Sequence, residues 1–166
     1  MKRALYYFFF ILFLFLVQTA MQKVFFASAF VPQLLLLAVI VAAATSDYRQ
    51  ALILAFGSGL LAEFASSISF GSFISAFVVA ALLSHLLTRK LTSQDISFGT
   101  ALLLVFGSTL FFAIWVYVFN LFTSGLSLGP EVLARDVFRW RLLLTGLVNL
   151  LCFFPLLRLY RIFFHE

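Results

Sequence analysis

The distribution of charge along the chain is the feature that most limits its fold. Long apolar runs follow one another with only short charged clusters between them, and each run is about as long as a helix that crosses ~30 Å of hydrocarbon. Hydrophobic residues make up 64% of the 166 and charged residues 10%, which leaves too few charges to cover a water-soluble domain. The sequence therefore predicts a single all-α membrane domain over residues 1–166.

Charged clusters and turn residues divide this domain into a bundle of about six transmembrane helices. The third and fourth helices are connected only by the segment 65–70, which suits a tight hairpin between antiparallel neighbours. The expected spans are 4–21, 25–45, 50–67, 71–88, 97–122 and 142–160.

The first span begins like a secretory signal, with Lys2 and Arg3 before an apolar stretch. Cleavage after Ala20 would place Gln18 at the position where a small residue is required. We therefore favour an uncleaved first span. Cys152, the single cysteine, lies within the last apolar run, where it can form no internal disulfide and indicates packing.

Lysine and arginine gather at the ends of the apolar runs, which is the positive-inside pattern of a bilayer protein. No basic face or stacking motif for nucleic acid accompanies the net charge of +5. Seven basic residues on one side against four on the other favour a multi-pass protein with both termini in the cytoplasm. The seven are Lys2, Arg3, Arg49, Arg89, Lys90, Arg158 and Arg161, and the four are Lys23, Arg135, Arg139 and Arg141.

The longest connection runs from Thr123 to Arg141 and contains Gly129 and Pro130. Proline followed by an acidic residue fits the start of a helix, and the mixture of apolar and basic residues that follows fits a segment in the membrane interface. An interfacial helix over 131–141 and a solvated loop remain equally open at this point.

Candidate catalytic groups are few. His85 lies near the cytoplasmic end of the fourth span, and no second ligand stands at metal-binding spacing from it, so we interpret it as an interfacial packing residue. The sequence contains no Gly-rich phosphate loop, serine elbow or zinc-binding helix. It predicts no enzyme, no cofactor and no metal site.

Glu63 is the one acid clearly inside an expected span, where a charged side chain costs at least ~2.5 kcal/mol. Ala51, Ala55 and Gly59 precede it at intervals of four, so one helix face carries a stripe of small residues that ends in a carboxylate. Glu63 therefore reaches the outer interface, contacts a partner, or serves a ligand or proton site.

The fourth span repeats this pattern with Ser72, Ala76, Ala80 and Ser84. Small residues at this spacing let two helices approach closely. The two stripes either close the hairpin on itself or offer one face to a partner helix.

The order of these features resembles the MreD family, the rod shape-determining membrane proteins of bacteria. The resemblance rests on Pro32 and the leucines after it, then Arg49, then the stretch Gly57-Ser58-Gly59-Leu60-Leu61-Ala62-Glu63, then Phe70-Gly71. It covers residues 1–165 in length and span count, and its specific part is 32–80. Glu63 stands where the family usually has aspartate, and Phe70 replaces a small or proline-containing approach to the glycine.

The resemblance implies a non-catalytic membrane scaffold of the cell-elongation complex, which helps to maintain rod shape through side-wall peptidoglycan synthesis. It implies the bacterial cytoplasmic membrane, direct binding to the single-span protein MreC, and indirect links to MreB, RodA and a class B penicillin-binding transpeptidase. Together with the small-residue stripes, it suggests partner-binding residues at Gly57, Gly59, Glu63, Gly71, Ala76 and Ala80.

The family is also similar in fold to the substrate-binding subunits of energy-coupling-factor vitamin transporters, which gives an alternative function. Such a subunit would bind a small molecule near its outer face, a site that needs several convergent polar groups. The outer ends of the spans offer chiefly Glu63, Asn120 and the arginines after Gly129. An intramembrane enzyme is a third alternative, for which no catalytic set is visible.

Overall fold

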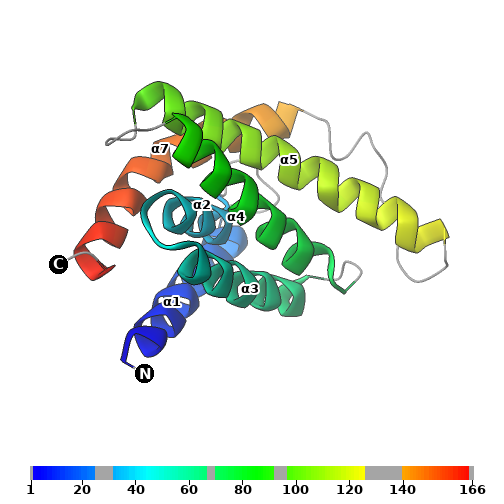
Figure 1. The fold of residues 1–166 in the computed structure, drawn as a ribbon. Coiled ribbons are helices and arrows are strands. Elements are labelled where there is room, and N and C mark those ends of the chain that lie inside the picture. The colour runs from blue at the N-terminus through cyan, green and yellow to red at the C-terminus, as the bar shows by residue number, and fades with distance from the viewer. Residues whose placement is uncertain (1, 25–31, 67–69, 92–96, 126–139, 165–166) are drawn as a thin grey trace.

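The computed structural model describes residues 2–24, 32–66, 70–91, 97–125 and 140–164, and within them six α-helices and no strand (Figure 1). The predicted interfacial segment 131–141 falls outside the described residues, except that Trp140 and Arg141 begin the last helix. The helices are α1 Lys2–Val24, α2 Leu34–Thr45, α3 Tyr48–Ala65, α4 Ser72–Leu91, α5 Phe98–Gly125 and α7 Trp140–Phe164.

Four of these helices, α1, α4, α5 and α7, are long and apolar enough to cross a membrane. The all-helical structure and these four helices confirm the prediction of an all-α, multi-pass membrane protein. The described residues thus contain four such helices against six expected spans, because those of the second span form only the twelve-residue α2 and α3 does not reach the hydropathy of the four. α3 has 18 residues, and Arg49, Gln50 and Glu63 keep the hydropathy of this stretch below that of the apolar stretches in the four spanning helices.

In the expected span 25–45, the described residues begin with Pro32 and Gln33, which precede the helix, and are helical from Leu34 to Thr45. Proline has no N–H group to donate and restricts the residue before it, so helices seldom run through it. The twelve residues of α2 extend about 18 Å, which is too short for the ~30 Å hydrocarbon layer.

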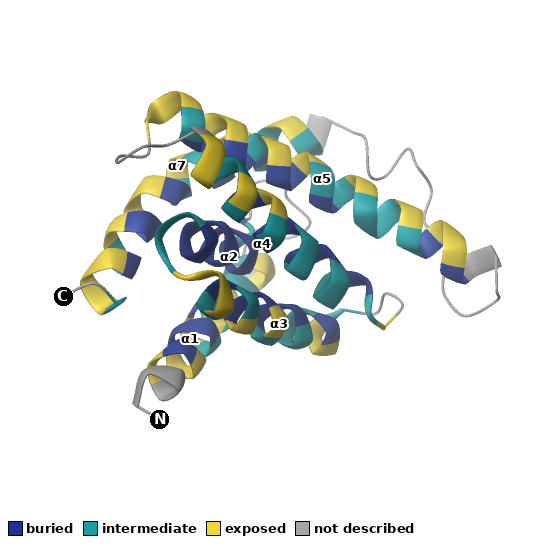
Figure 2. Ribbon diagram, viewed as in Figure 1, coloured by how far each residue is buried: buried dark blue, intermediate teal, exposed yellow. Residues whose placement is uncertain are grey.

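α2 lies in the centre of the bundle, where Figure 2 shows it buried along most of its length. Every residue from Leu34 to Ala43 is buried, and α1, α3, α4, α5 and α7 all contact the helix. A helix that is apolar on all sides is suited to such a position. The other helices therefore form a shell around a short central helix.

A hydrogen-bonded tyrosine cluster fixes one end of this shell. The hydroxyl group of Tyr7 donates to Oε1 of Gln50 at 3.0 Å, and the hydroxyl groups of Tyr160 and Ser46 are 2.9 Å apart. The two tyrosine oxygens are themselves 3.4 Å apart. The start of α1, the connection between α2 and α3, and the end of α7 therefore meet at this end.

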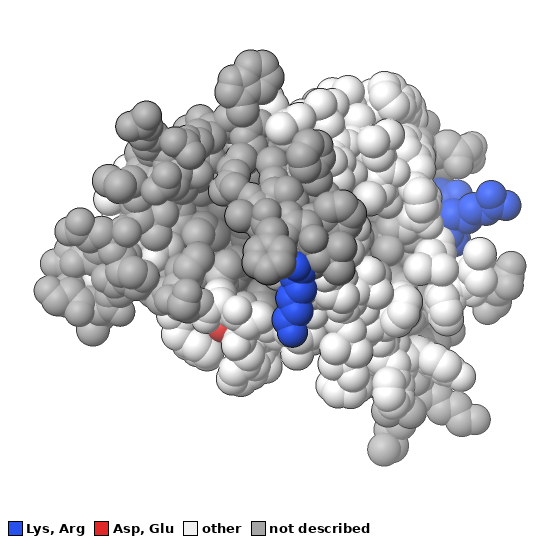
Figure 3. All heavy atoms as spheres, turned by 180° about the vertical axis from the view of Figure 1, so that it is seen from behind, with Lys and Arg blue, Asp and Glu red and all other residues white. Residues whose placement is uncertain are grey.

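Exposed basic residues gather at the same end of the bundle. Arg49 lies in the first turn of α3, while Arg89 and Lys90 end α4, and the ring contact between Tyr48 and His85 places these two helix ends together. On the face in Figure 3 the described surface is almost entirely uncharged, and lysine and arginine side chains (blue) stand apart from one another. The described charge thus lies mainly at helix ends, as expected for a chain surrounded by lipid.

Candidate functional site

The helix α4 begins at Ser72, directly after Gly71, and Glu63 of α3 provides its cap. Gly71 has a φ angle of +98°, which glycine adopts without strain, but glycine has no side chain with which to cap the helix. Oε1 of Glu63 instead accepts the backbone N–H groups of Phe73 at 2.6 Å and Ile74 at 3.3 Å. An N-cap side chain normally satisfies these positions. A distant carboxylate thus performs the work of a local capping residue.

Burial and charge both favour this contact. Glu63 is only 5% exposed, and its carboxylate faces the positive end of the α4 dipole. This contact within the chain therefore explains why an acidic residue is present in an apolar helix. Its second oxygen, Oε2, is buried without a hydrogen-bond partner among the described residues.

Gly59 lies one helical turn before Glu63 and brings α3 against α4. A Cβ atom at Gly59 would lie 2.6 Å from Cα of Ile74, a distance that real side chains essentially never show. Glycine is therefore required for the close approach that lets Glu63 reach the N–H groups of α4. The resulting α3–α4 hairpin is antiparallel, as the sequence predicts.

Both small-residue stripes are buried within the chain. Ala51, Ala55 and Gly59 are buried on α3, and all four small residues of the α4 stripe are at most 1% exposed. The chain itself covers both stripes, but not by pairing one with the other: Gly59 meets Ile74 of α4, and Ser84 of the α4 stripe meets Ser108 of α5. The α4 stripe consists of Ser72, Ala76, Ala80 and Ser84.

The six residues suggested for partner binding lie in three places. Gly59, Glu63 and Gly71 meet at the junction of α3 and α4, whereas Gly57 faces α1, where an added Cβ would lie 3.3 Å from Ile11. Ala76 and Ala80 lie further along the buried face of α4. A role in binding a partner stays a prediction for all six residues.

The start of α2 is a second polar site inside the bundle, which the sequence analysis missed. The N–H group of Gln33 donates to Oδ1 of Asn149 at 2.8 Å, and that of Leu35 donates to Oε1 of Gln18 at 3.1 Å. Nδ2 of Asn149 in turn donates to Oγ1 of Thr109 at 3.1 Å. Side chains of α1, α5 and α7 therefore hold the beginning of the central helix.

A signal for this second site is present in the sequence. Gln18 and Asn149 are uncharged polar residues inside expected spans, where a polar side chain needs a partner. The breaking of the helix at Pro32 would have indicated which N–H groups lacked an acceptor. These two observations indicate that the polar side chains and the free N–H groups each need a partner, but only the fold pairs them.

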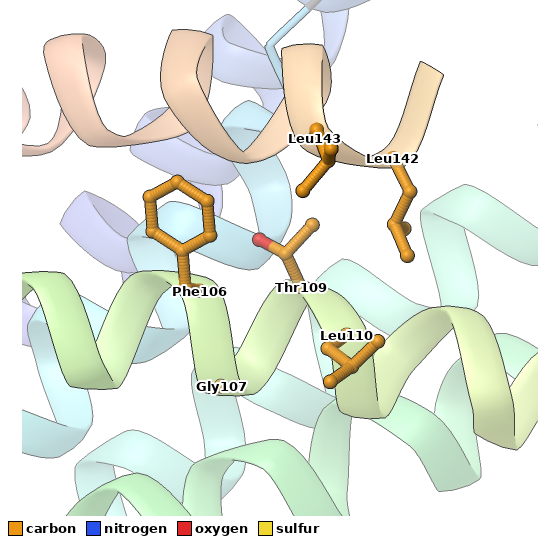
Figure 4. A pocket seen from close by; sticks show the side chains of 6 residues that line it. All are labelled: Phe106, Gly107, Thr109, Leu110, Leu142 and Leu143. Atoms are coloured by element: carbon orange, nitrogen blue, oxygen red, sulfur yellow. The ribbon is translucent and has the colours of Figure 1, made fainter. Parts of the chain in front are cut away.

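An apolar cavity of about 200 Å³ lies between α5 and α7. Figure 4 shows Phe106 and Thr109 pointing from α5 towards α7, from which Leu142 and Leu143 approach. Phe106 also packs on Gly146, where an added Cβ would lie 2.8 Å from the ring. The described lining is hydrocarbon apart from Thr109, whose hydroxyl oxygen accepts a hydrogen bond from Asn149.

The groups considered for catalysis are dispersed. Nδ1 of His85 lies 3.0 Å from the carbonyl oxygen of Ala43, and the ring contacts Tyr48, so the histidine packs α4 against its neighbours. Cys152 is half-buried on α7. Among the described residues, no three histidine, cysteine, aspartate or glutamate side chains are grouped closely enough to hold a metal ion.

No family model, curated protein or solved structure matches this chain. A functional proposal therefore rests on the features of this chain alone. The two most distinctive features are the capped α3–α4 hairpin and the polar start of α2.

Proposed function

We propose that this chain is a non-catalytic scaffold of the MreD type, which binds MreC in the bacterial cytoplasmic membrane and supports side-wall peptidoglycan synthesis. One observation carries the proposal. Much of the specificity of the resemblance comes from Gly59, Glu63 and Gly71, and these residues depend on one another. Gly59 lets the two helices approach closely, Glu63 caps α4, and Gly71 precedes the first residue of that helix. Apolar sequences converge easily in composition, so it supports the proposal that the residues which carry the resemblance also act together in the structure of this chain.

The hairpin would act as a rigid platform for the single span of MreC. Its internal face is filled by the small-residue stripes, while α3 presents a row of large apolar side chains outwards. Ile53, Phe56 and Phe64 are 63%, 54% and 76% exposed and lie at helical spacing on one face. Aromatic residues often provide much of the energy of an interface. We place the contact with MreC on this row, with MreB, RodA and the class B transpeptidase joined indirectly.

Cell shape tests this proposal. In a rod-shaped host whose own copy is depleted, the wild-type chain is expected to restore rods. The double variant Phe56→Ala/Phe64→Ala is expected to accumulate to wild-type levels and yet leave the cells rounded, because the fold keeps its core while the partner loses its aromatic contacts.

The matched control is Leu103→Ala/Phe122→Ala, which removes exposed apolar side chains from α5 instead. This control should restore rods. If both double variants give rounded cells, or both give rods, then the exposed row on α3 is not the partner surface. Failure of the wild-type chain to restore rods would contradict the scaffold function itself.

The same proposal places both termini in the cytoplasm, supported by the exposed basic residues at the end of the bundle that carries the tyrosine cluster. In a Cys152→Ala background, Lys90→Cys should react with a membrane-impermeant maleimide only after the cells are permeabilised. Lys23→Cys, at the far end of α1, should react in intact cells. The reverse pattern of labelling would show that the protein has the opposite orientation in the membrane.

A further inference from the structure

A cavity of about 130 Å³ lies beside the start of α2. Residues of α1, α2, α3, α4 and α5 line it together with Gln33, so its shape depends on how these five helices pack. This volume would hold several water molecules at ~30 Å³ each, or one small organic molecule. Its lining residues are Gln18, Gln22, Gln33, Leu36, Ala62, Phe73, Phe77 and Phe112.

The cavity has a polar and an aromatic side. Three glutamines provide primary amide groups, and none of the described residues that line the cavity is a lysine, arginine, aspartate or glutamate. On the other side, the rings of Phe73 and Phe77 lie 5.5 and 5.4 Å from the ring of Phe112. An ion would have no opposite charge in this lining, whereas a neutral molecule with a polar end and a flat apolar body would meet matching surfaces on both sides.

Gln33 supplies an unused acceptor at this cavity. Its backbone N–H group is already bonded to Asn149, but its side-chain oxygen Oε1 is buried and has no hydrogen-bond partner within the described part of the chain. Buried polar atoms in native proteins nearly always have a partner, supplied by protein, water or ligand. Gln33 therefore brings to the cavity lining a side chain whose acceptor still lacks a donor.

From these three observations we propose that the cavity binds a small uncharged molecule, a neutral aromatic amide or its equivalent, that donates an N–H or O–H group to Gln33 and lays its body against the phenylalanine rings. Nothing in the scaffold function requires this site. Its test is therefore independent of whether the chain binds MreC.

Benzamide and benzoate provide a matched pair of probes, because they have nearly the same shape but only benzamide is neutral at pH 7 and carries N–H donors. Equilibrium dialysis against the full chain in lipid nanodiscs should give saturable binding of benzamide at one site. Benzoate should bind at least about tenfold more weakly. Equal binding of the two probes, or no saturable binding of either, would overturn the proposal. Water would then be the expected occupant of the cavity.

Variants locate the site. Gln33→Met removes the acceptor at nearly constant volume and should weaken benzamide binding about tenfold. Ala62→Leu fills the cavity from α3 and should abolish binding while the protein keeps its thermal transition. The control Gln50→Met makes the same change at the tyrosine cluster and should leave the affinity unchanged. Wild-type affinity in both cavity variants would show that benzamide binds elsewhere and would overturn the assignment.

Discussion

Replacing Gly59 by alanine is expected to lower the free energy of unfolding by about 3 kcal/mol. The added methyl group would lie 2.6 Å from Cα of Ile74, so the clash is with backbone and no rotamer change relieves it. The two helices must separate, and Glu63 is then drawn away from the N–H groups that it caps. One methyl group is thus expected to disturb both the packing and the polar contact of the hairpin.

The same substitution on α5 provides the control. Gly107 is also within a helix, but a Cβ atom there would have no neighbour within 4 Å. Reversible unfolding in mixed micelles should show a large loss for Gly59→Ala and no loss for Gly107→Ala. Equal stability of the two variants would mean that α3 and α4 do not approach as closely as the structure shows.

Removal of the carboxylate in Glu63→Ala should cost roughly 3–5 kcal/mol, because two N–H groups at the start of α4 lose their acceptor in an apolar setting. Glu63→Gln keeps an acceptor oxygen but loses the negative charge at the positive helix end. Its cost should be only about 1 kcal/mol. If Glu63 acts as a cap, stability should therefore decrease in the order wild type, Glu63→Gln, Glu63→Ala.

Hydrogen exchange at the amides of Phe73 and Ile74 reports this contact directly. Protection at these two positions should fall most in Glu63→Ala. Asp47→Ala serves as the control, because Asp47 stands at the N-cap of α3 and makes no side-chain capping bond. Unchanged protection at Phe73 and Ile74 in Glu63→Ala would assign the carboxylate another role.

The hairpin could be predicted from sequence because its determinants are local. Small residues at intervals of four predict close packing of neighbouring helices, and the short connection after Ala65 fixes which helices these are. The sequence also indicates that Glu63 needs a partner. It does not identify the backbone of α4 as that partner, since the capping contact exists only once Gly59 has brought the helices together.

The interior position of α2 could not be predicted in the same way. Hydropathy scores the run before Thr45 as one apolar segment, and only Pro32 indicates a break in it. The groups that hold the new helix start lie far away in the chain, with Gln18 17 residues from Leu35 and Asn149 116 residues from Gln33. Such contacts leave no periodic pattern, and their recognition requires the fold.

The cavity beside α2 depends on tertiary structure even more strongly. Phenylalanine is abundant throughout the sequence, and nothing local distinguishes Phe73, Phe77 and Phe112 from residues that face lipid. Their rings meet because α4 and α5 pack together around the central helix. The resemblance to MreD points to a partner, whereas this cavity points to a small molecule, and the two features adjoin at Phe73, which Glu63 caps and which also lines the cavity.

Affinity purification of the tagged full chain from its native membrane in a gentle detergent, with identification of both proteins and small molecules, tests the scaffold function most directly. We expect recovery of MreC together with other elongation proteins, and loss of that recovery in Phe56→Ala/Phe64→Ala but not in Leu103→Ala/Phe122→Ala. Recovery of an ATPase-coupling membrane protein and a bound vitamin, with no elongation protein, would contradict the scaffold function and establish a transporter subunit in its place.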